Sequence, residues 1–480
     1  MTVRGAPLLA TVLAGLLWSG APAYEPTAVP STQPSKPDLS GPQYFNLRYQ
    51  EAYDYLDEHP EAYQADPFLR LKNLHLGEPW RVDFGGEMRS RFENRSNYTF
   101  GLDPRTSNTQ QNYRYLLHTN VKYEDMLRIF AQGIFAHVED QDGPFQPTQE
   151  NHGDFQQLFA DLRAPGGDLP VTLRFGRQEL QYGNSRVVGP LEWVSARRRF
   201  DGVRILYESP YVDVDAFYVK PAVVERTRAD LWNNDFDFYG LYSTFKGIPG
   251  HGVDTYFFAV DRTEDTLNPN GHTGDQSIYT LGARFWGRTG GWDYDTELAG
   301  QWGKWASDTV QAWAWDADGG YTFALAFSPR VGGGVSLAGG DEDPRDRRVQ
   351  TYSQLFPFNQ VCIGILDLVG RQNLNRAYVT VDFWPVPDKL FCGLYLHAYW
   401  LDEEKDYYYN VGGAPILRDP FGHSGTELGR ELDLWLEWRI DRHASLVFAY
   451  SHFWNGAYVH HRLRGEDEPD LFILQFQYRF

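Results

Sequence analysis

The chain has 480 residues, an aromatic content of 16% and a formal net charge of −20. This acidity argues against a nucleic-acid partner, because nucleic acids are bound through basic surfaces. Beyond the N-terminal leader, no stretch offers the roughly eighteen consecutive apolar residues of a membrane-spanning helix. If the chain spans a membrane, it does so as a closed β-barrel, which also pairs every backbone polar group within lipid.

The N-terminal 79 residues differ from the rest of the chain. Residues 1–23 have the features of a secretory signal peptide: Arg4, a short apolar core and an Ala-Pro-Ala cleavage site ending at Ala23. Residues 24–41 are rich in Pro, Ser and Thr, as linkers are. Residues 42–79 carry aromatic residues at loose helical spacing and predict one or two short helices. Two roles stay open for residues 24–79: packing against the mouth of a barrel, or binding a periplasmic secretion partner.

From Trp80 onward, apolar residues recur at every second position, which is the period of a β-strand. Within residues 80–93 the even positions are mainly apolar, and six of the odd positions are charged. Residues 470–480 alternate in the same way, with an aromatic face that ends on Phe480. Strands with one apolar and one polar face fit a transmembrane barrel that has lipid outside and water inside.

This period predicts about eighteen strands, an even number as bacterial barrels have. They are residues 80–95, 112–124, 127–140, 155–163, 169–177, 201–208, 211–219, 236–246, 252–261, 276–287, 292–304, 309–326, 329–338, 372–384, 389–402, 427–440, 443–456 and 470–480.

The connections between these strands alternate between short turns and long loops, with one lapse near residues 305–308. A barrel with tight turns at one end and long loops at the other produces this pattern. The predicted fold is therefore all-β: a transmembrane antiparallel up-and-down β-barrel of about 18 strands over residues 80–480, after a short, partly helical periplasmic segment. A secreted soluble all-β enzyme or sugar-binding protein is the alternative, since a soluble sheet can also bury an apolar face.

Several stretches, taken in order, carry a resemblance to a known family. They are Leu173-Arg-Phe-Gly-Arg-Gln178, Glu192-Trp193, Ala338-Gly-Gly-Asp-Glu-Asp343, Leu394-Tyr-Leu-His-Ala-Tyr-Trp400 with Asp402-Glu-Glu404, Gly429-Arg-Glu-Leu-Asp433 and Tyr478-Arg-Phe480. In these stretches the chain resembles the bacterial alginate-export outer-membrane proteins, over roughly residues 80–480. The resemblance implies a monomeric eighteen-stranded barrel in outer-membrane lipid that exports an anionic uronate polysaccharide through an arginine-rich constriction with long plugging loops. It also implies that Phe480 is read by the barrel-assembly machinery. Residues 24–79 depart from the family's pattern.

Alternation and the matching stretches together select candidate residues of the lumen, for pore lining and substrate binding. They are Arg89, Arg91, Arg114, Arg174, Arg177, Arg204, Arg284, Arg376, Arg439, Glu431 and Asp433. Rings of arginine select anions, because the guanidinium binds carboxylates through two parallel hydrogen bonds. The alternative is that these arginines and nearby carboxylates form ion-pair ladders that only stiffen the wall.

Two arginine positions have specific expectations. Arg177 breaks the alternation with Arg174, so we expect it at a strand end, pointing into the mouth or the following loop. The triplet Arg197-Arg-Arg199 ends that loop, and lies either at the rim of the constriction or on lipopolysaccharide phosphates.

No motif for catalysis or cofactor binding is present: the sequence has no Gly-x-Ser-x-Gly elbow, phosphate loop or dinucleotide fingerprint. We therefore expect neither an enzyme nor a cofactor. His118 and His460-His461 lack a ligand pattern, so no metal site is predicted. Acidic clusters in three loops are expected to be solvated charge. Cys362 and Cys392 are expected to stay unpaired, and a disulfide between them is the alternative.

The sequence thus predicts an outer-membrane channel that passes an anionic, alginate-like polysaccharide or oligosaccharide through an arginine-lined lumen gated by long loops. A general or small-solute uptake porin on the same barrel is the alternative.

Overall fold

The computed structural model is one closed sheet that forms a barrel, and it describes residues 44–101, 108–140, 147–164, 170–463 and 467–480. Eighteen long strands form the wall: β2 (Trp80–Ser96), β3 (Thr109–Tyr123), β4 (Leu127–Glu139), β5 (Asn151–Arg163), β6 (Val171–Gln178), β7 (Phe200–Glu208), β8 (Val212–Val223), β10 (Phe236–Ile248), β11 (His251–Leu267), β12 (Thr273–Thr289), β13 (Trp292–Trp305), β14 (Asp308–Thr322), β15 (Arg330–Ala338), β17 (Leu374–Val386), β18 (Leu390–Trp400), β21 (Glu427–Arg439), β22 (Ala444–Asn455) and β23 (Asp470–Arg479). The predicted signal peptide and the predicted linker, residues 1–41, lie outside the described residues.

Each wall strand pairs antiparallel with its neighbour in the chain, and the last strand closes the barrel on the first. In β2 and β23 the paired residues run from Glu87 opposite Arg479 to Ser96 opposite Asp470. All eighteen predicted strands are confirmed, although β14 ends at Thr322 rather than 326, because the chain turns there with positive φ at Phe327 and Ser328.

Short elements lie at the two ends of the barrel. They are β1 (Leu74–His75), β9 (Leu231–Trp232), β16 (Arg348–Val349), β19 (Tyr407–Tyr409), β20 (Pro415–Arg418), α1 (Ala62–Ala65), α2 (Asn359–Cys362), the 3-10 helices Arg48–Gln50, Asp54–Asp57, Pro67–Leu71 and Tyr98–Gly101, and a π-helix at Val459–Leu463. No helix in the described parts of the chain is long and apolar enough to cross a membrane.

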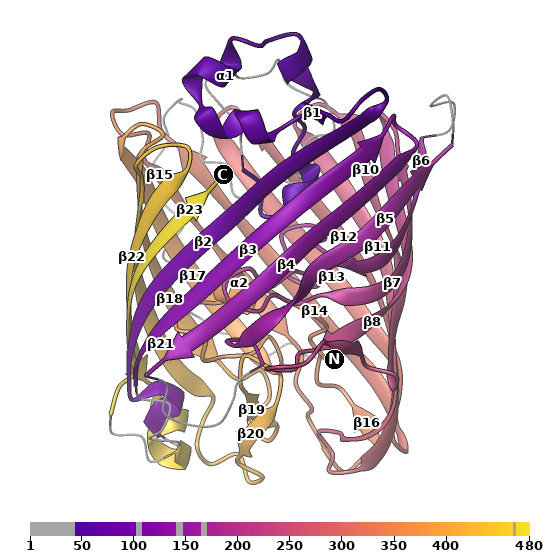
Figure 1. Ribbon diagram of the computed structural model, residues 1–480. Helices are drawn as coiled ribbons and strands as arrows, with labels where there is room; N and C mark the ends of the chain where they lie inside the picture. The colour runs from indigo at the N-terminus through magenta and orange to yellow at the C-terminus, as the bar shows by residue number, and fades with distance from the viewer. Residues whose placement is uncertain (1–43, 102–107, 141–146, 165–169, 464–466) are drawn as a thin grey trace.

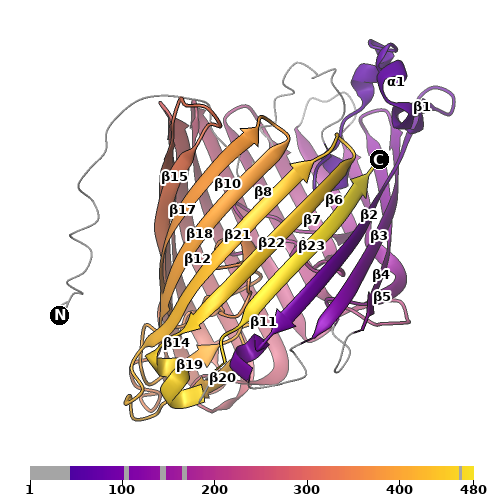
Figure 2. The same cartoon turned by 90° about the vertical axis from the view of Figure 1, so that its left-hand side faces the viewer.

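The connections separate into two sets, as predicted. At one end, called the turn end here, strands are joined by turns such as residues 209–211, 249–250 and 290–291. The loop end carries the long connections, among them residues 179–199, 339–373 and 401–426. Figure 1 shows α1 and β1 at the turn end, and β16, β19 and β20 at the loop end. Figure 2 shows the C-terminus beside α1.

Two loop-end connections are shorter than predicted, because the strands beside them are longer. The strands β11 and β12 each have 17 residues and leave only residues 268–272 between them. Residues 306–307 join β13 to β14. This short connection at the loop end is the exception to the alternation of short turns and long loops that the sequence shows near residues 305–308.

The two faces of the wall differ as the alternation predicts. On β2, Trp80, Phe84 and Met88 are about 40% exposed, and they face outward. The intervening Asp83, Glu87 and Arg89 are buried. A strand with an exposed apolar face and a buried charged face is the reverse of a soluble sheet and matches a wall with lipid outside.

Candidate functional site

Two long loops from the loop end fold into the lumen and bury its charged face. One comprises residues 179–199, between β6 and β7, and the other comprises residues 339–373, between β15 and β17. Leu180, Val188 and Leu366 are fully buried. The loops therefore occupy the space that a solute would need to cross.

The two loops are joined to each other by backbone hydrogen bonds. The amide of Gly189 donates to the carbonyl of Phe356 at 2.8 Å, and the amide of Phe356 donates to the carbonyl of Val187 at 2.9 Å. Arg198 adds hydrogen bonds to the carbonyls of Gly189 and Pro357. Because of these bonds, displacement of one loop disturbs the other.

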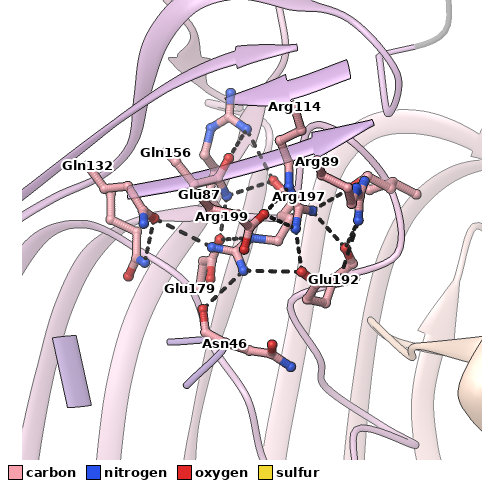
Figure 3. Close-up of polar contacts among 12 residues, drawn as sticks. Asn46, Glu87, Arg89, Arg114, Gln132, Gln156, Glu179, Glu192, Arg197 and Arg199 are labelled. Carbon is pink, nitrogen blue, oxygen red and sulfur yellow. Dashed lines mark hydrogen bonds and ion pairs between the residues drawn. The ribbon is translucent and has the colours of Figure 1, made fainter. Parts of the chain in front are cut away.

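Three inward arginines of β2 and β3 hold the 179–199 loop through its backbone. Arg89 donates to the carbonyls of Glu192 and Val194 at 3.1 and 3.0 Å, and Arg114 donates to the same two carbonyls at 2.8 and 3.0 Å. Arg91 donates to the carbonyl of Trp193 at 2.6 Å, and its guanidinium lies 4.0 Å from the centre of the indole ring. A run of three loop carbonyls thus occupies the donors of three wall arginines. Figure 3 shows Arg89 and Arg114 beside Glu192 of this loop.

The side chain of Glu192 adds a carboxylate to this arrangement. It forms an ion pair with Arg114, and lies 3.6 Å from Arg89. Burial opposes ionisation of Glu192, but the guanidiniums of Arg114 and Arg89 outweigh it and hold the pKa of that carboxyl below its ordinary range. On the wall side, Arg114 also donates to Glu87 at 2.8 Å. The arginines therefore bind a loop carboxylate as they would bind any other anion.

Glu431 and Asp433 of β21 hold the second loop, the one comprising residues 339–373. They act as hydrogen-bond acceptors, whereas the arginines of β2 and β3 act as donors. Glu431 accepts a hydrogen bond from the amide of Leu366 at 2.9 Å, and Asp433 accepts one from the amide of Ile365 at 3.2 Å. Gly364 lies so close that an added Cβ would come within 2.7 Å of the Glu431 carboxylate. The strands β2 and β3 thus bind loop carbonyls through arginines, whereas β21 binds loop amides through carboxylates.

Residues 44–73 pack against the turn end of the barrel. Arg48 donates to the carbonyls of Gly86 and Phe480 at 2.9 and 2.8 Å. Asn46 accepts hydrogen bonds from Arg197 and Arg479, both at 3.1 Å. The N-terminal segment therefore reaches the same arginine network as the 179–199 loop (Figure 3).

Four other predicted lumen arginines are also inward and buried. Arg174 donates to Asp161 at 2.7 and 2.9 Å, and Arg204 and Arg284 pair with aspartates of the adjacent strands. These three pairs correspond to the wall-stiffening alternative. Arg376 differs, since it donates to the carbonyl of Cys362 in the second loop.

Two of the arginines predicted to line the lumen, Arg177 and Arg439, are not buried within it, and the prediction is corrected for both. Arg177 lies on the same strand face as the outward Leu173 and Phe175, with Asp154 at 2.8 Å and Asp201 at 2.9 Å. Regular alternation carries it to the outer wall, and these two carboxylates hold it there. Arg439 is inward by alternation but half exposed beside the turn, where it pairs with Glu437 at 3.1 Å.

The arginine triplet of the 179–199 loop turns into the barrel. Arg197 and Arg199 are buried, with Arg197 pairing with Glu179 at 2.9 Å, so they belong to the lumen rather than to a lipopolysaccharide surface.

Sequence reasoning did not select Glu192 or Arg186 as site residues. Arg186 reaches from the same loop to Asp295 at 2.7 Å. Loop residues have no periodicity that shows which way they point. The only sequence signal for Glu192 was its position in Glu192-Trp193, one of the stretches that resemble the alginate-export proteins.

Comparisons with known proteins match this architecture. The chain matches the family model for alginate export over residues 80–470. OccAB2 of Acinetobacter baumannii has a TM-score of 0.58 and OccK8 (OprE) of Pseudomonas aeruginosa 0.54; each is 11% identical, over 83% of this chain and 98% of the other. The structure of Pseudomonas aeruginosa OpdK with vanillate has a TM-score of 0.53 at 13% identity, over 83% and 98%. At these identities the likeness is one of fold. No curated protein matches the sequence.

Proposed function

Since this outer-membrane β-barrel belongs to the alginate export family, we propose that it is a channel for an anionic, uronate-type polysaccharide or oligosaccharide. Transport is passive and involves no catalysis. The lumen of a single chain provides the path, so a monomer suffices. Short turns of outer-membrane barrels face the periplasm, and this rule supports a periplasmic position for residues 44–73, within reach of a secretion partner.

The observation that carries the proposal is the binding of Glu192 by Arg89 and Arg114. A loop carbonyl and a loop carboxylate occupy donors that suit the carboxylates of a uronate. When the loop leaves, these donors lose their partners, and unpaired buried charges are costly. Polymer carboxylates replace the loop as their partners.

The exchange of a loop partner for a polymer carboxylate also explains how the polymer leaves the channel. Each guanidinium already has a competing partner within the protein, either a loop carbonyl or a wall carboxylate such as Glu87. The gain from binding one uronate is therefore only the difference between two similar sets of hydrogen bonds. Contacts that are numerous but individually weak allow conduction.

A small-solute uptake porin is the second candidate. Its support is the shared barrel fold with OpdK, whose structure was solved with vanillate. Both candidates require loop displacement, but only the polysaccharide channel requires contact with a long polyanion.

Planar-bilayer recording with and without polyuronate distinguishes the two. We expect an anion-selective current that polyuronate blocks, and an Arg89→Gln, Arg114→Gln double variant that is blocked at least about tenfold more weakly, since each lost charged hydrogen bond costs about 1.5–3 kcal/mol. Arg204→Gln is the matched control, because Arg204 is also inward and buried but pairs with Asp215. A current that polyuronate does not block would favour the small-solute porin.

A further inference from the structure

His137, Glu150 and His152 form a cluster on the outer wall at the loop end, away from the lumen. His137 is two residues from the end of β4, His152 is the second residue of β5, and Glu150 directly precedes β5. The cluster lies beside the outward-facing Phe135, whose ring is stacked on His152 with centroids 5.5 Å apart. The three ligand atoms all lie within 4.8 Å of one another.

Both imidazoles direct an unpartnered nitrogen at the same carboxylate oxygen. Nδ1 of His137 and Nε2 of His152 are buried and have no hydrogen-bond partner. They lie 3.4 and 3.6 Å from Oε1 of Glu150. Buried polar atoms normally find a partner, so two orphaned nitrogens around one oxygen need an explanation.

The two nitrogen–oxygen separations suit a tetrahedral metal ion. Zinc bonds of about 2.0–2.1 Å to nitrogen and oxygen place neighbouring tetrahedral ligands about 3.3–3.4 Å apart. We propose that His137, Glu150 and His152 bind one Zn²⁺-type divalent ion, with water in the fourth position. Two imidazoles disfavour Ca²⁺ and Mg²⁺, which take oxygen ligands.

Arg226 is the group that the ion displaces. Its guanidinium lies 3.0 Å from Oε1 of Glu150, and its side chain is half exposed, so it can turn into solvent. The backbone need not move, because the amide of His152 keeps its bond to the carbonyl of Arg226 at 2.8 Å.

The site adjoins a segment that contacts the 179–199 loop. The carbonyl of Thr148, two residues before Glu150, accepts a hydrogen bond from the amide of Ala196 at 2.9 Å. A bound ion therefore fixes the segment 147–150 to β4 and β5, and with it one backbone support of the 179–199 loop.

The test is zinc titration of the chelator-treated protein in detergent, without a polyhistidine tag and with excess Mg²⁺ and Ca²⁺. We expect one Zn²⁺ per chain, and a tetrahedral absorption spectrum when Co²⁺ replaces it. His137→Ala and His152→Ala should each weaken binding at least about tenfold, since even partners outside the ligand set alter metal affinity by about 10–100-fold. His423→Ala, an exposed histidine in another loop, is the control.

Two results would overturn the site: variants that bind zinc like the wild type, or wild-type binding that Mg²⁺ abolishes. Heat-modifiable migration in SDS gels shows that each variant is folded. If a variant is not, zinc K-edge X-ray absorption of the wild type decides: scattering from two imidazoles supports the site, and an oxygen-only shell overturns it.

Discussion

Arg114 holds Glu192 twice: its guanidinium donates to the backbone carbonyl of Glu192 at 2.8 Å and also to the side-chain carboxylate. Arg114 belongs to the wall and Glu192 to the 179–199 loop, so this relationship fixes the loop inside the barrel. Since it consists of charge-assisted hydrogen bonds, it is strong when formed and exchangeable for another carboxylate.

Glu192→Gln should loosen the loop while leaving the barrel intact. Glutamine keeps the size of the side chain but removes the charge that Arg114 and Arg89 bind. A loss of about 1.5 kcal/mol would raise the ratio of open to closed channels about tenfold. Single-channel recording measures this ratio, with Glu437→Gln at the turn-end rim as control. Equal open fractions in wild type and variant would show that Glu192 does not hold the loop.

Arg48→Met should release residues 44–73 from the turn end. The substitution removes the donors to Gly86 and Phe480 and leaves Glu51 buried without its ion-pair partner. Breaking a buried pair costs about 3–5 kcal/mol. We expect faster proteolysis of residues 44–73 and larger conductance, whereas Arg70→Met, at an exposed position in the same segment, should change neither. If proteolysis stays slow, other contacts hold the segment in place.

Gly364→Ala should displace the second loop. The added Cβ would meet the hydroxyl of Tyr399 at 2.5 Å and the carboxylate of Glu431 at 2.7 Å. We expect faster hydrogen exchange at the amides of Ile365 and Leu366, which donate to Asp433 and Glu431. Gly247→Ala has open space around it and serves as control. Unchanged exchange would mean that the loop is not held at this position.

Acidic pH should tighten the loop around Glu403. Partial burial and then the neighbouring carboxylates of Asp402 and Glu342 raise the pKa of Glu403 to about 7, from an ordinary value of 4.5. A carboxyl with a raised folded-state pKa favours the folded loop at low pH, and this advantage is lost as pH rises from about 4.5 to about 7. Hydrogen exchange of residues 401–406, corrected for intrinsic rates, should therefore slow at pH 5.5 relative to pH 8. In Glu403→Gln this difference should shrink, and an equal pH effect in both proteins would assign it to other groups.

The wall was predictable from sequence because the pleat imposes a period of two that eighteen strands repeat. Alternation alone placed Arg89, Arg91 and Arg114 inward, and it would also have placed Arg177 outward. The loops were not predictable in the same way. Nothing periodic in residues 179–199 shows that Glu192 folds back onto Arg114, or that Asn46 reaches Arg197. Likewise, His137 and His152 lie on separate strands, and only the register brings them together.

The most direct test of the polysaccharide-channel proposal is a single-channel recording of the Glu192→Gln variant, whose 179–199 loop should open more often. The current is measured with added polyuronate and, separately, with a neutral polysaccharide of equal length. We predict anion-selective openings that polyuronate blocks and the neutral polymer does not, with the block weakened by Arg89→Gln and Arg114→Gln. Openings that neither polymer blocks, or that both block equally, would contradict the proposal.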